Sequence, residues 1–164
     1  MDAGFLCSYS DILYRPSVVQ RALTHPGDIV LCVDTEWRAR YVDRSQHPED
    51  DAEKVIADGD RIVRIERSIG SEQANGEYIG VARFNDRGAR ALCDYYHRSR
   101  AAFAGSIWLD GTSFEKAYLI HLFQYMIEDG VDVRMVTTDG EYMEIDTEED
   151  YALANVRWPQ EYGD

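Results

Sequence analysis

The sequence predicts an α/β domain in which helices cover the faces of one sheet. Apolar runs of strand length alternate with amphipathic helical segments along the 164 residues, and this alternation is typical of the class. Hydrophobic residues make up 45% of the chain, enough for one core at this length. Because the sequence contains no internal repeat or low-complexity tract, we expect a single domain with a mainly parallel sheet.

Strand candidates differ in how completely they are expected to be buried. Residues 28–34 (DIVLCVD) form a continuous apolar run with β-branched side chains, which favours a buried strand. Residues 53–67 alternate in character around Asp58-Gly59, which predicts a hairpin. The other strand candidates are 8–14 (SYSDILY), 77–84, 131–140 and 141–146.

Four segments have helical periodicity. A proline near its start predicts a short helix over 15–23, and a second helix is expected over 85–102. Thr112 with Glu115, and Thr147 with Asp150, have the spacing of capping boxes. They predict helices that begin at these threonines and end near Gly130 and Val156.

The charge balance restricts the partners. A formal net charge of −14 argues against nucleic acid, because binding to a phosphate backbone uses clustered Lys and Arg. An anionic small molecule would need a divalent cation held by carboxylates, although a solvated acidic surface also explains the charge. No apolar run approaches the ~20 residues of a membrane span, and the start lacks a secretory signal. We therefore expect a cytoplasmic protein without membrane contact.

Two aspartates follow predicted strands. Asp11 lies in SYSDILY and Asp146 ends EYMEID. Ligands of open α/β sheets bind outside the carboxyl ends of the strands, where two carboxylates could share a divalent cation. Each residue alone also has a structural explanation: Asp11 can cap the turn into RPSVV, and Asp146 can favour the N-terminus of the next helix.

Other candidates are weaker. Trp37, within DTEWRARY, could line a pocket for an ammonium group or simply cover a sheet edge. The acidic run PEDDAE (48–53) is expected to be a solvated loop, to which we assign no site. The four histidines, His25, His47, His97 and His121, lack zinc-site spacing, so no zinc site is predicted.

A family resemblance spans Phe5 to Trp158. In order, the segments SYSDILY, IVLCVDTEWRARY, RIVRIERSI, GEYIGVARF and TTDGEYMEIDTEEDYALA resemble the sugar-phosphate nucleotidyltransferase superfamily. The likeness is strongest to its cytidylyltransferases for phosphocholine and for phosphonates such as 2-aminoethylphosphonate and 2-hydroxyethylphosphonate. This resemblance implies a three-layer α/β/α, Rossmann-like fold of the nucleotide-diphospho-sugar transferase type, with a mixed sheet.

The resemblance also implies roles for individual residues. Asp11 and Asp146 match the aspartates that hold Mg²⁺ against the nucleotide phosphates in this family. Glu77, after Gly76, matches a contact to the acceptor's amine or hydroxyl, although a solvated residue beside a turn would look the same. The implied activity is Mg²⁺-dependent transfer of a nucleotidyl group, cytidylyl from CTP, to a small phosphonate or phosphocholine-like acceptor, with release of pyrophosphate.

One part of the family pattern is missing from this sequence. Family members begin with a strand and a G-x-G-x-R-L loop over the nucleotide phosphates, and neither precedes residue 8 here. We therefore expect residues 1–164 to be the C-terminal two-thirds of a single nucleotidyltransferase-like domain, N-terminally truncated. Catalysis would need a missing N-terminal segment or a companion chain, and the first strand would lack a neighbour. The alternative is a non-catalytic remnant or partner-binding α/β module.

Overall fold

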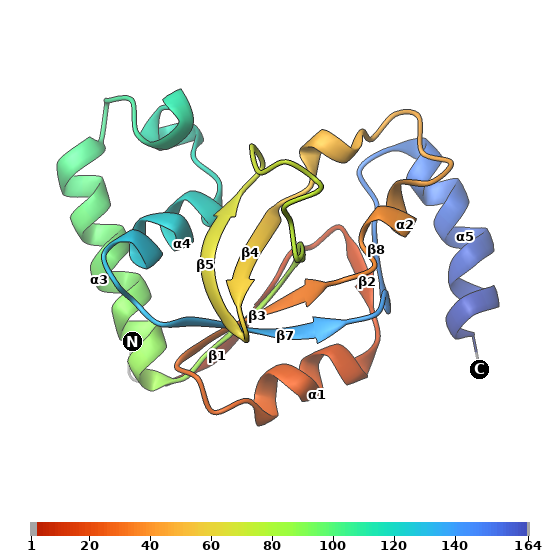
Figure 1. Cartoon of the computed structure of the whole chain (residues 1–164), viewed down its shortest axis with the longest axis horizontal. Helices are drawn as coiled ribbons and strands as arrows, with labels where there is room; N and C mark the ends of the chain where they lie inside the picture. Colours follow the sequence, from red (N-terminus) through yellow and green to blue (C-terminus); the bar gives the residue numbers. More distant parts are fainter. Residues whose placement is uncertain (1–2, 164) are drawn as a thin grey trace.

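A six-stranded sheet forms the centre of the molecule (Figure 1). The computed structural model describes residues 3–163. The strand order is β1-β6-β3-β7-β5-β4, and β2 and β8 form a separate two-stranded sheet. The strands are β1 (Phe5–Ser8), β2 (Ile12–Tyr14), β3 (Ile29–Asp34), β4 (Lys54–Asp58), β5 (Arg61–Glu66), β6 (Gly76–Phe84), β7 (Val133–Thr138) and β8 (Tyr142–Glu144).

The sheet is mixed, so the expectation of a mainly parallel sheet is wrong. Within residues 3–163, β3 and β7 form the one parallel pair, and the other paired strands run antiparallel. β4 and β5 must be antiparallel because a turn of two residues, Gly59 and Asp60, joins them. The mixed sheet that the family resemblance implies is confirmed.

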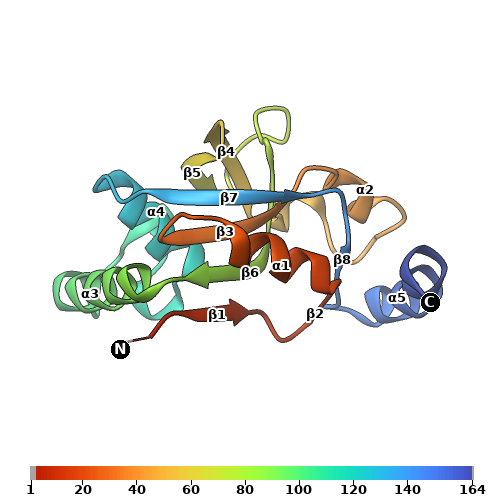
Figure 2. The same cartoon turned by 90° about the horizontal axis from the view of Figure 1, so that it is seen from below.

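Helices cover both faces of the main sheet (Figure 2). α1 packs on one face, against Val30 and Cys32 of β3, whereas α3 and α4 pack on the other, against Ile29, Leu31 and Val33. This alternation is what a strand buried on both faces requires. The helices are α1 (Pro16–Thr24), α2 (Arg38–Tyr41), α3 (Asp86–Phe103), α4 (Leu119–Glu128) and α5 (Glu148–Tyr162), with 3₁₀ turns at Glu49–Asp51, Leu109–Gly111 and Phe114–Lys116.

The two predicted capping boxes have different outcomes. The Thr147–Asp150 box is present and begins α5. The Thr112–Glu115 box is wrong, because α4 begins at Leu119, where the Tyr118 N–H donates to His121 Nδ1. Glu115 instead accepts a hydrogen bond from the Gly105 backbone. Thus the side chain with cap spacing stabilises the preceding loop rather than the helix.

The stretch SYSDILY is not one strand. β1 ends at Ser8 and β2 begins at Ile12, so Asp11 lies in the bend between them. β1 is half-buried at the edge of the main sheet. The bend packs closely on β6: Gly80 has φ +78°, and a Cβ there would lie 2.4 Å from the Tyr9 ring. Only glycine suits both the backbone and this contact.

None of the helices in residues 3–163 combines the length and apolar character needed to cross a membrane. The two clusters of buried apolar side chains lie instead inside the molecule, one on each face of the main sheet. The three cysteines are free; Cys32 is buried, and Cys7 and Cys93 are partly buried.

Candidate active-site cleft

A cleft of about 690 Å³ opens beside the two-stranded sheet. Six parts of the chain line it: the end of β1 with the bend after it, the loop before β4, the residue after β5, the start of β6, the residue before α4, and β8 with the residues that follow. Its lining is strongly acidic. The lining residues are Ser8, Tyr9, Ser10, Asp11, His47, Asp51, Glu53, Arg67, Glu77, Tyr78, Ile79, Tyr118, Tyr142, Glu144 and Asp146.

Strand pairing brings Asp11 and Asp146 to the same lip of this cleft. β2 and β8 run antiparallel with Ile12 opposite Glu144, and the Ile145 N–H donates to the Asp11 carbonyl over 2.8 Å. Both aspartates are exposed and line the cleft. Two aspartates 135 positions apart in the sequence therefore line one cleft.

Asp146 is held by the first turn of α5. Asp150 Oδ2 accepts hydrogen bonds from the backbone N–H groups of Asp146, over 3.2 Å, and of Thr147, over 3.0 Å. Asp150 is buried and also forms an ion pair with Arg44 (Nε to Oδ1, 2.6 Å). The capping box thus fixes the backbone that carries Asp146 and leaves its own side chain free.

Glu77 is buried at the cleft, so its interpretation as a solvated turn residue is wrong. The residue is 3% exposed, and Oε1 accepts a hydrogen bond from the Tyr41 hydroxyl over 2.5 Å. Oε2 is buried without a hydrogen-bond partner within residues 3–163. The pKa of Glu77 is raised to about 8, mainly by burial; the Tyr41 hydrogen bond lowers it, and the nearby charges of Glu144 and Asp34 raise it.

The acidic run 48–53 also contributes to the cleft, contrary to the prediction of a solvated loop. Asp51 lines it, and Glu53 is only 6% exposed. Glu53 Oε2 accepts from the Tyr9 hydroxyl over 3.0 Å, and Oε1 lies 3.6 Å from Arg67 Nη2. Burial raises the pKa of Glu53, and Arg67 and the Tyr9 hydrogen bond oppose this effect.

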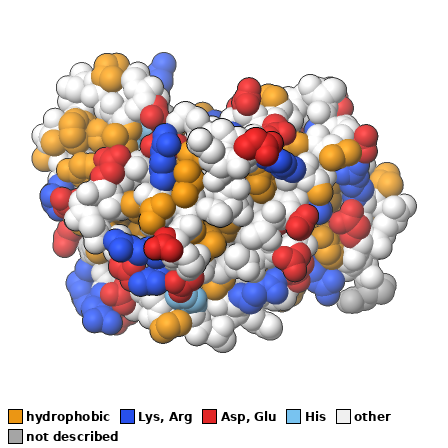
Figure 3. Space-filling view, in the orientation of Figure 1, with side chains coloured by type: hydrophobic (Ala, Val, Ile, Leu, Met, Phe, Trp, Pro, Cys, Tyr) orange, Lys and Arg blue, Asp and Glu red, His pale blue; other side chains and the backbone are white. Residues whose placement is uncertain are grey.

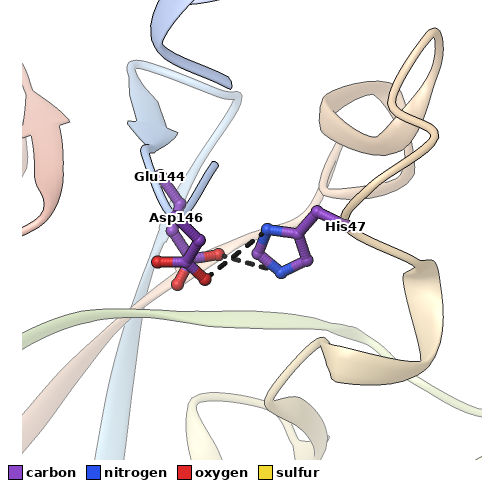
Figure 4. A group of neighbouring side chains, drawn as sticks. All are labelled: His47, Glu144 and Asp146. Carbon is purple, nitrogen blue, oxygen red and sulfur yellow. Dashed lines mark ion pairs between the residues drawn. The ribbon is translucent and has the colours of Figure 1, made fainter. Parts of the chain in front are cut away.

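The sequence interpretation missed His47 and Glu144, which Figure 4 shows pointing toward each other and toward Asp146. Nε2 of His47 lies 3.6 Å from Glu144 Oε2, and Nδ1 lies 3.6 Å from Asp146 Oδ2. Burial, followed by the negative charge of Asp146, raises the pKa of Glu144 to about 7. Glu144 could have been found, since it precedes Asp146 by two positions and so shares its side of an extended chain. His47 lies in a loop without any such pattern.

Trp37 lies apart from the cleft. It is 3% exposed and lines a separate shallow hollow with residues such as Arg38 and Glu72. Two cations already lie over its ring, Arg38 at 5.6 Å and Lys54 at 6.0 Å from the centroid. Its predicted contact with an acceptor stays a prediction, with no support from its position.

The charge of the cleft suits a divalent cation. Six of its lining side chains are carboxylic acids and one is an arginine. Burial is the main cause of the raised pKa values of Glu77 and Glu144, and neighbouring carboxylates add to it. Exposed carboxylate oxygens such as those of Asp11 and Asp146 are the donors that Mg²⁺ takes while keeping water and phosphate oxygens as further ligands. The donor set therefore fits the ion that the family resemblance implies.

The mixed sheet and its covering helices form a Rossmann-like α/β fold that two solved nucleotidyltransferases share. The inositol-1-phosphate CTP transferase from T. maritima superposes with a TM-score of 0.61 and 24% identity, over 92% of this chain and 52% of that one. The nucleoside-diphosphate-sugar pyrophosphorylase from Vibrio cholerae RC9 gives 0.58 and 14%, over 92% and 55%.

Sequence comparison agrees with the fold. The chain is 25% identical over 142 residues to the CTP:phosphoglutamine cytidylyltransferase of Campylobacter jejuni, which covers 86% of this chain and 54% of that protein. The chain thus spans about half the length of the curated relative. No family model matches the sequence. The resemblance to the sugar-nucleotidyltransferase superfamily, with cytidylyltransferase-like neighbours, is confirmed.

Proposed function

We propose that this chain supplies the metal- and acceptor-binding side of a Mg²⁺-dependent cytidylyltransferase that acts on a small phosphonate or phosphocholine-like acceptor. The observation that supports this most is the meeting of Asp11 and Asp146 at one lip of an acidic cleft. The similarity to a CTP-using relative supports the nucleotide. In the reaction, an acceptor oxygen attacks the α-phosphorus of CTP, the bond to the β-phosphate breaks, and pyrophosphate leaves.

Asp11 and Asp146 are the residues that would hold Mg²⁺. Bound there, the ion would neutralise phosphate charge next to carboxylates that otherwise repel a triphosphate. The chain's own contribution is to position these carboxylates. The β2–β8 pairing fixes Asp11, and the Asp150 hydrogen bonds fix the backbone at Asp146. Phosphoryl-type transfer depends largely on such positioning, so no protein nucleophile is required.

The inner part of the cleft suits the amine of an acceptor. Glu53 and Glu77 are buried carboxylic acids there, and Tyr9, Tyr78 and Tyr142 provide aromatic surface. Glu77 Oε2 has no hydrogen-bond partner within the described chain, so an ammonium or hydroxyl group would satisfy it. We therefore propose Glu77 as the contact to the acceptor's amine or hydroxyl.

The test separates acceptor binding from turnover. Isothermal titration calorimetry of the full chain with phosphocholine and 2-aminoethylphosphonate, in the presence of Mg²⁺, measures binding. Ethylphosphonate, which lacks the amine, is the control ligand. Pyrophosphate release is then assayed with CTP and each of the other three common nucleoside triphosphates. We expect amine-bearing acceptors to bind and Glu77→Gln to weaken that binding.

The outcomes are distinct. Pyrophosphate release that is greatest with CTP supports the complete proposal. Acceptor binding without release under any nucleotide supports the binding-module alternative instead of catalysis by this chain. Equal affinity for the amine-bearing and amine-free ligands would refute the role of Glu77. The absence of both acceptor binding and pyrophosphate release would refute the proposed function.

A further inference from the structure

We propose that His47, Glu144 and Asp146 form a binding site for a divalent transition-metal ion such as Mn²⁺, Co²⁺ or Zn²⁺. The site shares Asp146 with the proposed Mg²⁺ site but does not otherwise depend on the proposed function. Unlike the proposed Mg²⁺ site of Asp11 and Asp146, it includes a nitrogen donor, which His47 supplies from the loop before β4. Figure 4 shows the three side chains converging from β8 and from the loop before β4.

The spacing of the three groups fits one ion. One donor atom from each residue lies within 4.8 Å of the others. Glu144 Oε2 lies 3.6 Å from His47 Nε2, whereas Asp146 Oδ2 lies 3.6 Å from the other ring nitrogen, Nδ1. Metal–ligand bonds of about 2.0–2.2 Å in tetrahedral geometry separate donor atoms by roughly 3.3–3.6 Å. Rotation of the exposed Asp146 side chain toward Nε2, by about 1 Å at its oxygens, would bring the three donors around one ion.

Burial makes this group more than a surface acidic cluster. The side chain of His47 is 5% exposed and that of Glu144 is 20% exposed, whereas Asp146 is 42% exposed. A site with two largely buried donors and one open side can hold an ion and still accept water or a ligand. Glu77, in the same cleft, adds a 97%-buried carboxyl group with an unpartnered oxygen among residues 3–163.

The chain also orients the imidazole. Arg44 Nη2 donates to His47 Nδ1 in this structure, and Asp150 Oδ2 lies 3.6 Å from the same nitrogen. When Nε2 binds a metal, Nδ1 would carry the proton and turn from Arg44 to Asp150, the usual second contact of a metal-binding histidine. Backbone N–H groups of Ser45 and Gln46 donate to Glu149, over 2.8 and 2.9 Å, which ties the loop to α5. The ring is therefore held in place before any ion binds.

One contact opposes a cation. Arg44 Nη2 reaches His47 Nδ1, so a positive charge already lies beside the ring. However, Arg44 is paired with Asp150, and the cleft carries six acidic side chains against Arg67. The balance favours a cation. A nitrogen donor favours Mn²⁺, Co²⁺ or Zn²⁺ over Mg²⁺, which prefers oxygen ligands.

Direct metal binding tests the site without nucleotide or acceptor. The full chain is titrated with MnCl₂, CoCl₂, ZnCl₂ and MgCl₂ by calorimetry, and Co²⁺ binding is followed by its visible absorption. We expect His47→Gln and Glu144→Gln each to weaken Co²⁺ and Mn²⁺ binding by at least ~10-fold. His47→Gln should leave Mg²⁺ binding unchanged. His97→Gln, at an exposed position of α3, is the matched control and should bind like the parent.

Two results would overturn the site: no saturable Co²⁺ or Mn²⁺ binding by the parent chain, or equal affinities in His47→Gln and His97→Gln. If His47→Gln does not fold, NMR of the parent decides, because bound Mn²⁺ must broaden the His47 ring signals before those of His97. Asp11→Asn separates the two proposals. It should retain Co²⁺ binding, and a chain that binds Co²⁺ through His47 but never transfers nucleotide refutes only the proposed function.

Discussion

Two hollows of almost equal size differ completely in chemistry. The cleft at Asp11 and Asp146 measures about 690 Å³, and a second hollow between α3 and α4 measures about 680 Å³. The cleft has six acidic side chains and the second hollow has one, Glu115. The second is lined mainly by aromatic and aliphatic groups, including Tyr96, Trp108 and Phe114. Figure 3 shows hydrophobic side chains gathered over this part of the molecule.

The contrast shows why volume alone does not identify a reactive site. Aromatic side chains beside a hollow are explained by packing, because their burial lowers the free energy of the fold. Buried carboxyl groups without partners raise it. The cleft keeps one such oxygen, Oε2 of Glu77, and places the largely buried Glu144 beside Asp146. This unfavourable arrangement is what indicates a ligand. Tyr118 lines both hollows, so a substitution there tests which of the two it serves.

The largest effect should come from the cleft's two exposed aspartates. In a chain extended by an N-terminal phosphate-loop segment, Asp11→Asn and Asp146→Asn should each lower kcat/KM for pyrophosphate release by ~10²-fold or more, as lost electrostatic contacts commonly do. The fold should be intact, since both side chains are exposed. Circular dichroism and urea unfolding check the fold. Asp94→Asn on α3 is the control. If kcat/KM fell equally in all three variants, the cleft would not differ in function from the region around α3.

The second prediction concerns the pH dependence of stability. The pKa of Glu77 is about 8 in the folded chain against 4.5 for an ordinary glutamate, so the folded state holds more protons between these values. The free energy of unfolding should therefore fall as pH rises from about 4.5 to about 8, by up to ~1.4 kcal/mol per pH unit for this proton. Glu77→Gln should remove this part of the slope.

Urea unfolding of the parent and of Glu77→Gln from pH 5 to pH 8.5 measures the difference. The variant should gain stability relative to the parent toward the alkaline end. Parallel curves would show that Glu77 is not a strained carboxyl group and would weaken the contrast with the aromatic hollow.

The third prediction concerns the aromatic hollow. The Trp108 ring packs against Phe103, Phe114 and Tyr125 at centroid distances of 5.3–5.8 Å. Because the residue is only partly buried, Trp108→Ala should destabilise the fold by about 2–3 kcal/mol, less than a fully buried tryptophan. Metal and acceptor affinities should not change. Calorimetric titration alongside urea unfolding would reveal any loss of binding, which would contradict a packing role.

The smallest effect is expected at the shared wall. The Tyr118 side chain stacks under Arg67, whose guanidinium carbon lies 4.2 Å from the ring centroid. Tyr118→Leu should lower the unfolding free energy by about 0.5–1 kcal/mol, the usual worth of an exposed cation–π contact, and change acceptor affinity little. A larger change in affinity than in stability would assign Tyr118 to the cleft, and Tyr96→Leu provides the comparison on the other side.

Much of the fold follows from local sequence patterns. The buried strand at 29–34, the hairpin around Gly59 and the capping box at Thr147 are confirmed because their side-chain periods and turn residues act over a few positions. The start of α4 is wrong because Glu115 finds a distant partner, Gly105 N–H. Local spacing could not reveal that competition.

The site was only partly accessible from the sequence. The strand-end argument and the family resemblance correctly brought Asp11 and Asp146 together in one cleft, although their roles stay predictions. The burial of Glu53 and the position of His47 depend on how the loop before β4 folds over the sheet. Nothing in a charged run distinguishes such a loop from a solvated one. Trp37 shows the opposite case, since an aromatic residue beside arginines proved to be packed away from the cleft.

The attachment of the loop 44–47 to the first turn of α5 has a consequence for biosynthesis. Arg44 contacts Asp150, and Ser45 and Gln46 contact Glu149, more than a hundred positions later. Until Glu149 and Asp150 have been translated, the loop 44–47 lacks these contacts to α5. The loop that carries His47 therefore takes its final position only after Glu149 and Asp150 have been synthesised, and a nascent chain cannot complete the cleft before then.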